Sequence, residues 1–199
     1  MNSKKEKPVI LLVHAFPHSS KMWELNIADL SKTYRVIAPD LAGFGKSSVR
    51  EWSLPDSAEM IAKSLEERGI QGPVFVAGLS MGGYMALEFL RRFPQRCCGL
   101  GLFATRATPD TPDALEKRRL SIEAIEKFGI EPFARKAVKS QLGKTTQEKN
   151  PVLVEKVLGF MKEASSKAAI NALKAMADRR DNSELLPKIN FPALVIAGG

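Results

Sequence analysis

The sequence predicts an α/β fold, in which a doubly wound, mostly parallel sheet of about five strands carries an inserted all-helical segment. Three observations lead to this prediction. Five short apolar runs occur along the chain, and segments with helical periodicity separate the first four. The runs are mostly apolar at consecutive positions, which is typical of strands buried on both faces. Between the fourth and fifth runs, a long stretch contains only helix-like patterns.

The predicted strands and helices alternate in the first half of the chain. Strand–helix–strand repetition requires right-handed crossovers, and these produce a parallel sheet with helices on both faces. In the second helix, Asp56 is the predicted N-cap and Gly69 the predicted C′ residue. The predicted strands are residues 9–14, 35–39, 74–77, 98–104 and 193–197. The helices between them are residues 22–31, 57–68 and 81–93.

The long stretch between the last two strands is rich in Ala, Lys and Glu. Its apolar residues recur with helical spacing, and glycines together with the segment "KTTQEKNP" separate the helices. We therefore expect an α/β core of residues 1–111 and 187–199, with residues 112–186 forming a helical cap over the end of the sheet. The predicted cap helices are residues 113–127, 131–141, 151–163 and 166–178.

The composition is ordinary for a soluble protein, with 44% hydrophobic and 26% charged residues. The first apolar run, "VILLV", is too short to cross a bilayer, and no signal-peptide cleavage site follows it. Cys97 and Cys98 are adjacent and have no other partner, which fits a reducing compartment. The net charge of +8 is spread over separate helices. These features predict a cytoplasmic protein that binds neither membranes nor nucleic acid, and they leave homo-oligomer formation open.

The strongest functional signal is the sequence Gly-Leu-Ser-Met-Gly around Ser80. This G-x-S-x-G pattern follows a predicted strand and precedes a predicted helix, the context that a nucleophilic serine requires. A sharp turn there exposes the hydroxyl at the carboxyl end of the sheet, where open α/β folds bind ligands. The alternative is a serine in an ordinary tight turn.

Four stretches of the sequence together resemble the α/β-hydrolase family, in its serine esterase and lactonase branch with a helical cap. "VAGLSMGGYMALEFLRRFP" resembles the nucleophile elbow of that family and the helix after it. "LLVHAFPHSSKMWE" is similar to the His-Gly-x-Pro loop after the first core strand of that family, and "RVIAPDLAGFGKSS" to its Pro-Asp-x-x-Gly-x-Gly-x-Ser loop. "INFPALVIAGG" resembles the strand that precedes the catalytic acid of the family.

The resemblance implies an oxyanion hole, which needs two aimed hydrogen-bond donors. It assigns one to the backbone N–H of Met81, directly after the nucleophile, and the other to the backbone N–H of Phe16. Ala15 stands where glycine is commoner in the family. Candidate residues for an apolar substrate pocket are His18, Trp23 and Leu79, although Trp23 could equally be a core residue.

A serine nucleophile needs a base, and the chain has two histidines, His14 and His18, both in the loop after the first strand. The resemblance implies a structural role for His14. The triad order of this fold is Ser, acid, then His, so His18 would be an unusual base. Asp40 is interpreted as a turn residue. Asp110 is a fallback acid, although helix capping explains it more simply. We therefore expect the catalytic Asp and His to lie beyond Gly199.

These observations predict a hydrolase of small carboxylic esters or lactones that acts through an acyl-enzyme on Ser80. No metal ligand cluster and no phosphate-binding loop is recognisable, so no metal and no cofactor is predicted. The 199-residue chain alone is expected to lack activity. Two alternatives stay open: a non-catalytic ligand-binding relative, and an inactive truncated fragment. An exposed, aggregation-prone sheet edge is also expected at the last strand.

Overall fold

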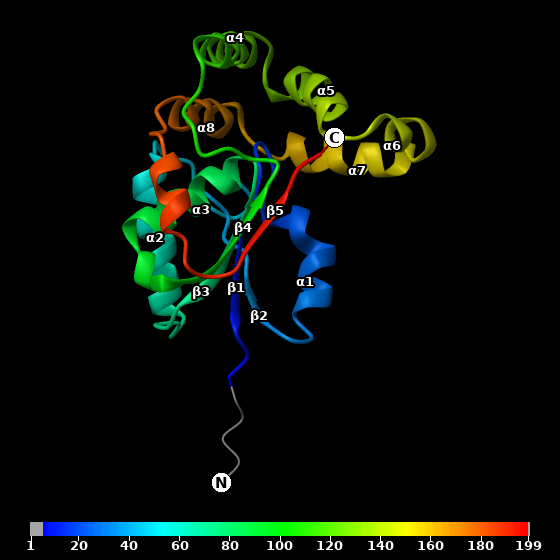
Figure 1. Cartoon of the computed structure of the whole chain (residues 1–199). Helices are drawn as coiled ribbons and strands as arrows, with labels where there is room; N and C mark the ends of the chain where they lie inside the picture. Colours follow the sequence, from blue (N-terminus) through cyan, green and yellow to red (C-terminus); the bar gives the residue numbers. More distant parts are fainter. Residues whose placement is uncertain (1–5, 199) are drawn as a thin grey trace.

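A computed structural model of the chain describes residues 6–198 and shows one five-stranded sheet with helices on both faces. All four strand pairings are parallel, and the strand order is β2-β1-β3-β4-β5 (Figure 1). The predicted fold class is therefore confirmed. The strands are β1 (Val9–Val13), β2 (Arg35–Ile37), β3 (Val74–Leu79), β4 (Cys97–Phe103) and β5 (Ala193–Ile196).

One layer of helices covers each face of the sheet, and alternate residues of β1 pack against the two layers. Leu11 and Val13 pack into the cluster beneath α2 and α3, whereas Ile10 and Leu12 pack on the opposite face, beside α1. This alternation follows from the two-residue period of a strand. The helices are α1 (Glu24–Leu30), α2 (Leu54–Glu67) and α3 (Met81–Arg92), with short 3₁₀ helices η1 (Ser20–Trp23) and η2 (Pro94–Arg96).

Helix α2 begins earlier than the sequence predicts. Ser53 is its N-cap, and the Ser53 hydroxyl accepts a hydrogen bond from the Asp56 amide while the Asp56 carboxylate accepts from the Ser53 amide. Asp56 is therefore the third helical residue of a capping box and not the N-cap. The predicted end of the helix is correct. Gly69 has φ +74°, its amide donates to the Glu66 carbonyl, and the Ile70 amide donates to the Leu65 carbonyl.

Helices α4 to α8 lie at the end of the sheet where the strands have their carboxyl ends, in the upper part of Figure 1. Four of them match the predicted helices in order and approximate length. The fifth, α6, forms within "KTTQEKNP", which the sequence suggested was only a connection. A further 3₁₀ helix, η3 (Ser183–Lys188), leads to β5. The five are α4 (Pro112–Phe128), α5 (Ile130–Gln141), α6 (Lys144–Lys149), α7 (Pro151–Lys162) and α8 (Ser166–Ala177).

These helices attach to the core unevenly. The alanine-rich face of α8 packs into the main hydrophobic cluster, together with Ile125 of α4. Helices α5 and α7 have a small cluster of their own. The helices on the sheet and the helical segment therefore share one core, mainly through α8, and Ile130 and Phe133 of α5 also pack against it. The separate cluster consists of Ala134, Val138, Leu158 and Met161.

Strand β5 differs from the expectation that the strands are buried on both faces, but it matches the expectation of an exposed sheet edge at the last strand. It pairs with β4, but all four of its residues are exposed, and Val195 is 69% exposed. The other edge of β5 has no neighbouring strand among residues 6–198. The sequence correctly indicated a strand, because Val195 and Ile196 are β-branched residues that favour extended backbone.

None of the helices within residues 6–198 has the length and the apolar character that crossing a bilayer would require. The two cysteines are both free thiols: Cys97 is buried at the start of β4 and Cys98 is exposed.

Candidate active site

Ser80 connects β3 directly to α3 and has a backbone conformation that side chains rarely adopt, with φ 53° and ψ −110°. Such a residue costs on the order of 1–3 kcal/mol, so surrounding contacts must hold it. The Ser80 amide donates to the Phe103 carbonyl at 2.8 Å. The Ser80 carbonyl accepts from the Gly83 amide at 2.9 Å and from the Thr105 hydroxyl at 2.8 Å. The strained turn is therefore fixed from both sides.

The glycines of the motif allow this turn to sit against β1. A methyl group on Gly78 would lie 2.0 Å from the Gly82 carbonyl oxygen, and one on Gly82 would lie 2.1 Å from that of Val13. A methyl group on Gly83 would lie 2.4 Å from the Thr105 hydroxyl oxygen. With backbone contacts this close, any larger residue would force the backbone to shift, so packing favours glycine at both motif positions.

Met81 is the first residue of α3, and its side chain is fully buried. The amides of Gly83 and Tyr84 donate back to the Ser80 carbonyl, but within residues 6–198 the Met81 amide has no protein acceptor. The first N–H groups of a helix lack intrahelical partners and carry a positive partial charge. The space beside the Ser80 hydroxyl thus adjoins a helix end that favours negative charge.

The loop after β1 leaves the sheet beside the Ser80 turn, because Val13 pairs with Gly78. In this loop the Ala15 carbonyl accepts two hydrogen bonds, from His14 Nδ1 at 3.0 Å and from the His18 amide at 2.9 Å. The Ala15 carbonyl and the Phe16 N–H belong to one planar peptide unit. The two bonds therefore also set the direction of the Phe16 N–H. Ala15 is not among the residues with positive φ, so its methyl group causes no backbone strain.

His14 is fully buried, and both its ring nitrogens are engaged. Its Nε2 accepts from the Leu41 amide at 3.0 Å, so Nδ1 carries the proton and donates to the Ala15 carbonyl. Burial lowers the pKa of His14 to about 4, which keeps the ring neutral. The ring joins the loop after β1 to the loop after β2, and neither nitrogen is free to act as a base.

His18 lies in the same loop and is 5% exposed. Its Nε2 contacts Oε1 of Gln141, the last residue of α5, at 2.8 Å. Its Nδ1 is buried and has no partner among residues 6–198. Burial lowers the pKa of His18, and the hydrogen bond that its ring donates to Gln141 only partly opposes this effect.

Leu79 and Trp23 lie on the α1 side of the sheet. Leu79 ends β3 and is half-buried, and Trp23 ends η1 and is 7% exposed. The Trp23 ring contacts Phe103 edge to face, with 6.5 Å between ring centroids. Trp23 therefore contributes to the core, which is one of the two roles that the sequence left open.

Asp40 stabilises a turn, as the sequence suggested. Its carboxylate accepts from the Ser20 amide at 2.7 Å and from the Lys46 amide at 2.9 Å. Partial burial raises the pKa of Asp40, but these hydrogen bonds outweigh burial and the net shift is downward. The carboxylate thus fixes the loop after β2 onto η1.

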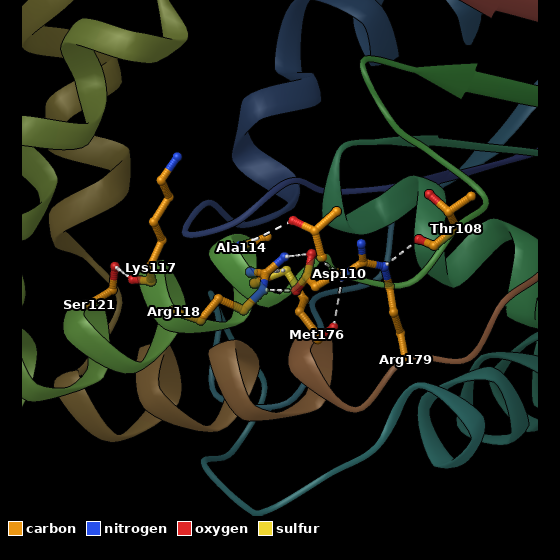
Figure 2. Close-up of polar contacts among 9 residues, drawn as sticks. Thr108, Asp110, Ala114, Lys117, Arg118, Ser121, Met176 and Arg179 are labelled. Atoms are coloured by element: carbon orange, nitrogen blue, oxygen red, sulfur yellow. Dashed lines mark hydrogen bonds and ion pairs between the residues drawn. The ribbon is translucent and has the colours of Figure 1, made fainter.

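Asp110, the fallback acid, is held by two arginines where α4 approaches α8 (Figure 2). Its side chain is 3% exposed, pairs with Arg179 Nη1 at 2.7 Å and accepts a hydrogen bond from Arg118 Nε. Burial raises the pKa of Asp110, but the hydrogen bonds and charges of Arg118 and Arg179 outweigh burial, and the net shift is downward. Thr111, and not an aspartate, caps α4 by accepting from the Ala114 amide at 3.3 Å. Within residues 6–198, the Asp110 carboxylate is thus engaged by Arg118 and Arg179.

Sequence reasoning missed two residues of this region. Thr105 follows β4 and binds the Ser80 carbonyl, and Gln141 contacts the loop that contains Phe16 and His18. No motif includes either residue. Only the pairing of β4 with β3 and the position of α5 bring them to the site.

Comparisons with known proteins agree with this geometry. The family profile described as alpha/beta hydrolase fold matches residues 8–148. A thermophilic esterase from Thermogutta terrifontis is 35% identical, with a TM-score of 0.90 over 96% of this chain and 71% of its own. A 3-oxoadipate enol-lactonase from Acinetobacter baylyi is 27% identical over the whole chain and 73% of its own length. The enol-lactonase from Burkholderia xenovorans, at 22% identity, shares the fold with a TM-score of 0.87.

Proposed function

The chain belongs to the α/β hydrolase fold family, with esterases and lactonases among its homologues, and from this premise we propose that it is a serine hydrolase of small carboxylic esters or lactones. The observation that carries the proposal is the strained conformation of Ser80 between β3 and α3. Strain of this kind persists where surrounding structure over-determines it, and it concentrates at reactive residues. The same residue stands at the positive end of a helix.

In the proposed reaction, Ser80 Oγ attacks the carbonyl carbon of the ester while a base removes the hydroxyl proton. The carbonyl oxygen becomes an oxyanion, which the N–H groups of Met81 and Phe16 stabilise. Collapse of this intermediate expels the alcohol, which takes a proton, and leaves an acyl group on Ser80. Water then attacks the acyl carbon and releases the acid. Two observations support this assignment: the Met81 amide has no protein acceptor in the described part of the chain, and the peptide plane before Phe16 is fixed.

We propose that the base and the acid of the triad come from the protein beyond Gly199. His14 has no free nitrogen, and Asp110 is neutralised by Arg118 and Arg179. His18 has one free nitrogen, but it lies in the oxyanion loop and would reverse the usual chain order of the triad. The relatives named above are longer than this chain, which spans 71% of the esterase and 73% of the lactonase.

We also propose that residues 112–186 act as a cap that selects the substrate, on a core of residues 1–111 and 187–199. Five helices lie over the carboxyl ends of the strands, where ligands of α/β folds bind. His18 and Leu79 are candidate pocket residues beneath them, and Trp23 supports Leu79 from the core side.

A fluorophosphonate probe tests the nucleophile directly, because it labels only an activated serine. We expect the full-length protein to be labelled at Ser80 and the Ser80→Ala variant to be unlabelled. Labelling at an equal rate in both would contradict the proposal. Absence of labelling in an intact, folded protein would instead favour the non-catalytic ligand-binding alternative.

The same probe tests the origin of the base. We expect the chain of residues 1–199 to label far more slowly than a longer form of the protein, since Ser80 then lacks its activating histidine. Equal rates would place the base within residues 1–199, and a His18→Ala variant would then identify it.

A further inference from the structure

Gln141 makes the most specific contact between the helical segment and the loop that precedes η1. It is the last residue of α5, and its side chain reaches two groups of that loop. Oε1 lies 2.8 Å from His18 Nε2, and Nε2 donates to the Phe16 carbonyl at 3.2 Å. One amide group thus binds both residues that flank Pro17.

Hydrogen-bond chemistry fixes the orientation of this amide. The Phe16 carbonyl can only accept, so the NH₂ group of Gln141 must face it. Oε1 then faces His18 Nε2, which must carry the proton of the neutral ring. His14 has the opposite tautomer, since its Nε2 accepts from the Leu41 amide. The two histidines of the chain should therefore be distinguishable by tautomer.

A second residue of α5 contacts the same loop. Phe133 meets the Phe16 ring edge to face, with 5.7 Å between centroids, and Phe44 contacts the Phe16 ring from another side at 6.4 Å. Phe133 and Gln141 are eight positions apart, about two helical turns, so they lie on one face of α5. The helix thus holds Phe16 both by its ring and by its carbonyl.

We propose that Gln141 is a positioning residue that couples the helical segment to the proposed oxyanion loop. The N–H and the carbonyl of Phe16 stand on either side of its Cα. The N–H side is already fixed, because the Ala15 carbonyl in the same peptide unit accepts hydrogen bonds from the His14 ring and the His18 amide. Gln141 fixes the other side. Displacement of α5 therefore releases the Phe16 backbone and misaligns its N–H. The catalytic part of this inference rests on the proposed function, whereas the mechanical part does not.

The mechanical part is tested on residues 1–199 without any reaction. In Gln141→Ala we expect the ring-nitrogen NMR signals of His18 to change while those of His14 stay constant. Backbone hydrogen exchange of residues 14–19 should accelerate at least about fivefold, because the loop loses two of its fixed contacts. Unchanged His18 signals together with unchanged exchange would overturn the proposal.

Gln147→Ala is the matched control. Gln147 also donates from its side chain to two carbonyls, those of Lys139 and Leu142, but both lie within the helical segment. This variant loses a comparable pair of bonds without touching the loop. We expect wild-type His18 signals and wild-type exchange over residues 14–19. Equal effects in both variants would show general loosening and would also overturn the proposal.

Gln141→Glu separates the two bonds. A carboxylate can accept from His18 Nε2 but cannot donate to the Phe16 carbonyl. Its charge should raise the pKa of His18, seen as a higher NMR titration midpoint, while loop exchange accelerates as in Gln141→Ala. An unchanged midpoint would contradict contact between these side chains.

The catalytic part is tested by ester hydrolysis with the full-length protein, using p-nitrophenyl acetate. Removal of an oxyanion donor costs 10²- to 10³-fold in kcat, and misplacement should cost less. We expect Gln141→Ala to lower kcat about tenfold with KM changed less than about twofold, and Gln147→Ala to match wild type. Accelerated exchange with unchanged kcat would overturn the coupling. If wild type neither hydrolyses the ester nor labels at Ser80, the proposed function fails, and the NMR and exchange results still decide the mechanical part.

Discussion

At the scale of single residues, Ser80 keeps a costly backbone conformation because its neighbours leave little room for another one. Its carbonyl is held by Thr105 and by the first turn of α3, and the glycines before and after it contact backbone directly. The motif was readable from the sequence because glycine is the residue that such close approaches require. Thr105 was not, since its contact depends on how β4 pairs with β3.

Replacing Gly82 with alanine tests the close approach to β1. The new methyl group would lie 2.1 Å from the Val13 carbonyl oxygen, so backbone must shift. We expect Gly82→Ala to lower the free energy of unfolding by about 1–3 kcal/mol in urea denaturation. Gly159→Ala is the control, since Gly159 is exposed in α7 with nothing within 4 Å, and it should stabilise by about 0.5–1 kcal/mol. A Gly82→Ala variant as stable as wild type would contradict the geometry.

Burial of His14 predicts a loss of stability in mild acid. Its pKa is about 4 in the folded protein and about 6.5 when unfolded. Between these values the unfolded state binds more protons, so stability falls as pH falls through this window, by at most about 1.4 kcal/mol per pH unit. His18 shifts in the same direction. NMR titration of the two rings separates them, and a His14 midpoint near 6.5 would refute the assignment.

At the scale of secondary-structure elements, the apolar runs predicted all five strands, because consecutive apolar residues are a local signal. Helix α6 was missed for the opposite reason: "KTTQEK" is polar throughout and forms a helix beside α7 without an apolar pattern of its own. The start of α2 was misplaced because Ser53 and Asp56 bind one another reciprocally. Either residue can serve as an N-cap, so the sequence alone does not show which of the two begins the helix.

Removal of the Ser53 hydroxyl tests this cap. We expect Ser53→Ala to cost about 1 kcal/mol in the free energy of unfolding, because the Asp56 amide loses its acceptor. Ser121→Ala is the control: Ser121 lies inside α4 and donates only to the Lys117 carbonyl of its own helix (Figure 2). Alanine there favours helix, so no loss is expected. Equal losses in the two variants would argue against a specific capping role.

At the scale of the whole molecule, the segment before α4 and the segment after α8 contact each other at one place. The Asn182 amide donates to the Ala107 carbonyl at 2.9 Å, and Arg179 Nε donates to the Thr108 carbonyl at 3.2 Å. Arg179 also pairs with Asp110 and stacks over the Tyr84 ring of α3 at 4.2 Å. The sequence could not predict this arrangement, because its members are far apart along the chain and each is an ordinary charged residue.

Loss of the Asp110 carboxylate should destabilise this junction. Asp110→Ala leaves the buried guanidinium of Arg179 without its counter-ion, and breaking such a pair costs about 3–5 kcal/mol. We expect a lower urea midpoint and faster proteolysis within residues 112–177. Glu116→Ala removes an exposed partner of Arg119 and should change neither measurement. Similar proteolysis of the two variants would contradict a specific role for Asp110.

The meeting of the two ends at Asp110 and Arg179 has an evolutionary consequence. An insertion whose ends touch can be lengthened, shortened or exchanged without altering the strand order, because the sheet on either side keeps the same connection points. Five helices stand there in this chain. If residues 112–186 select the substrate, as proposed above, replacing this one contiguous block would change substrate preference while the glycines and the serine turn stay unchanged.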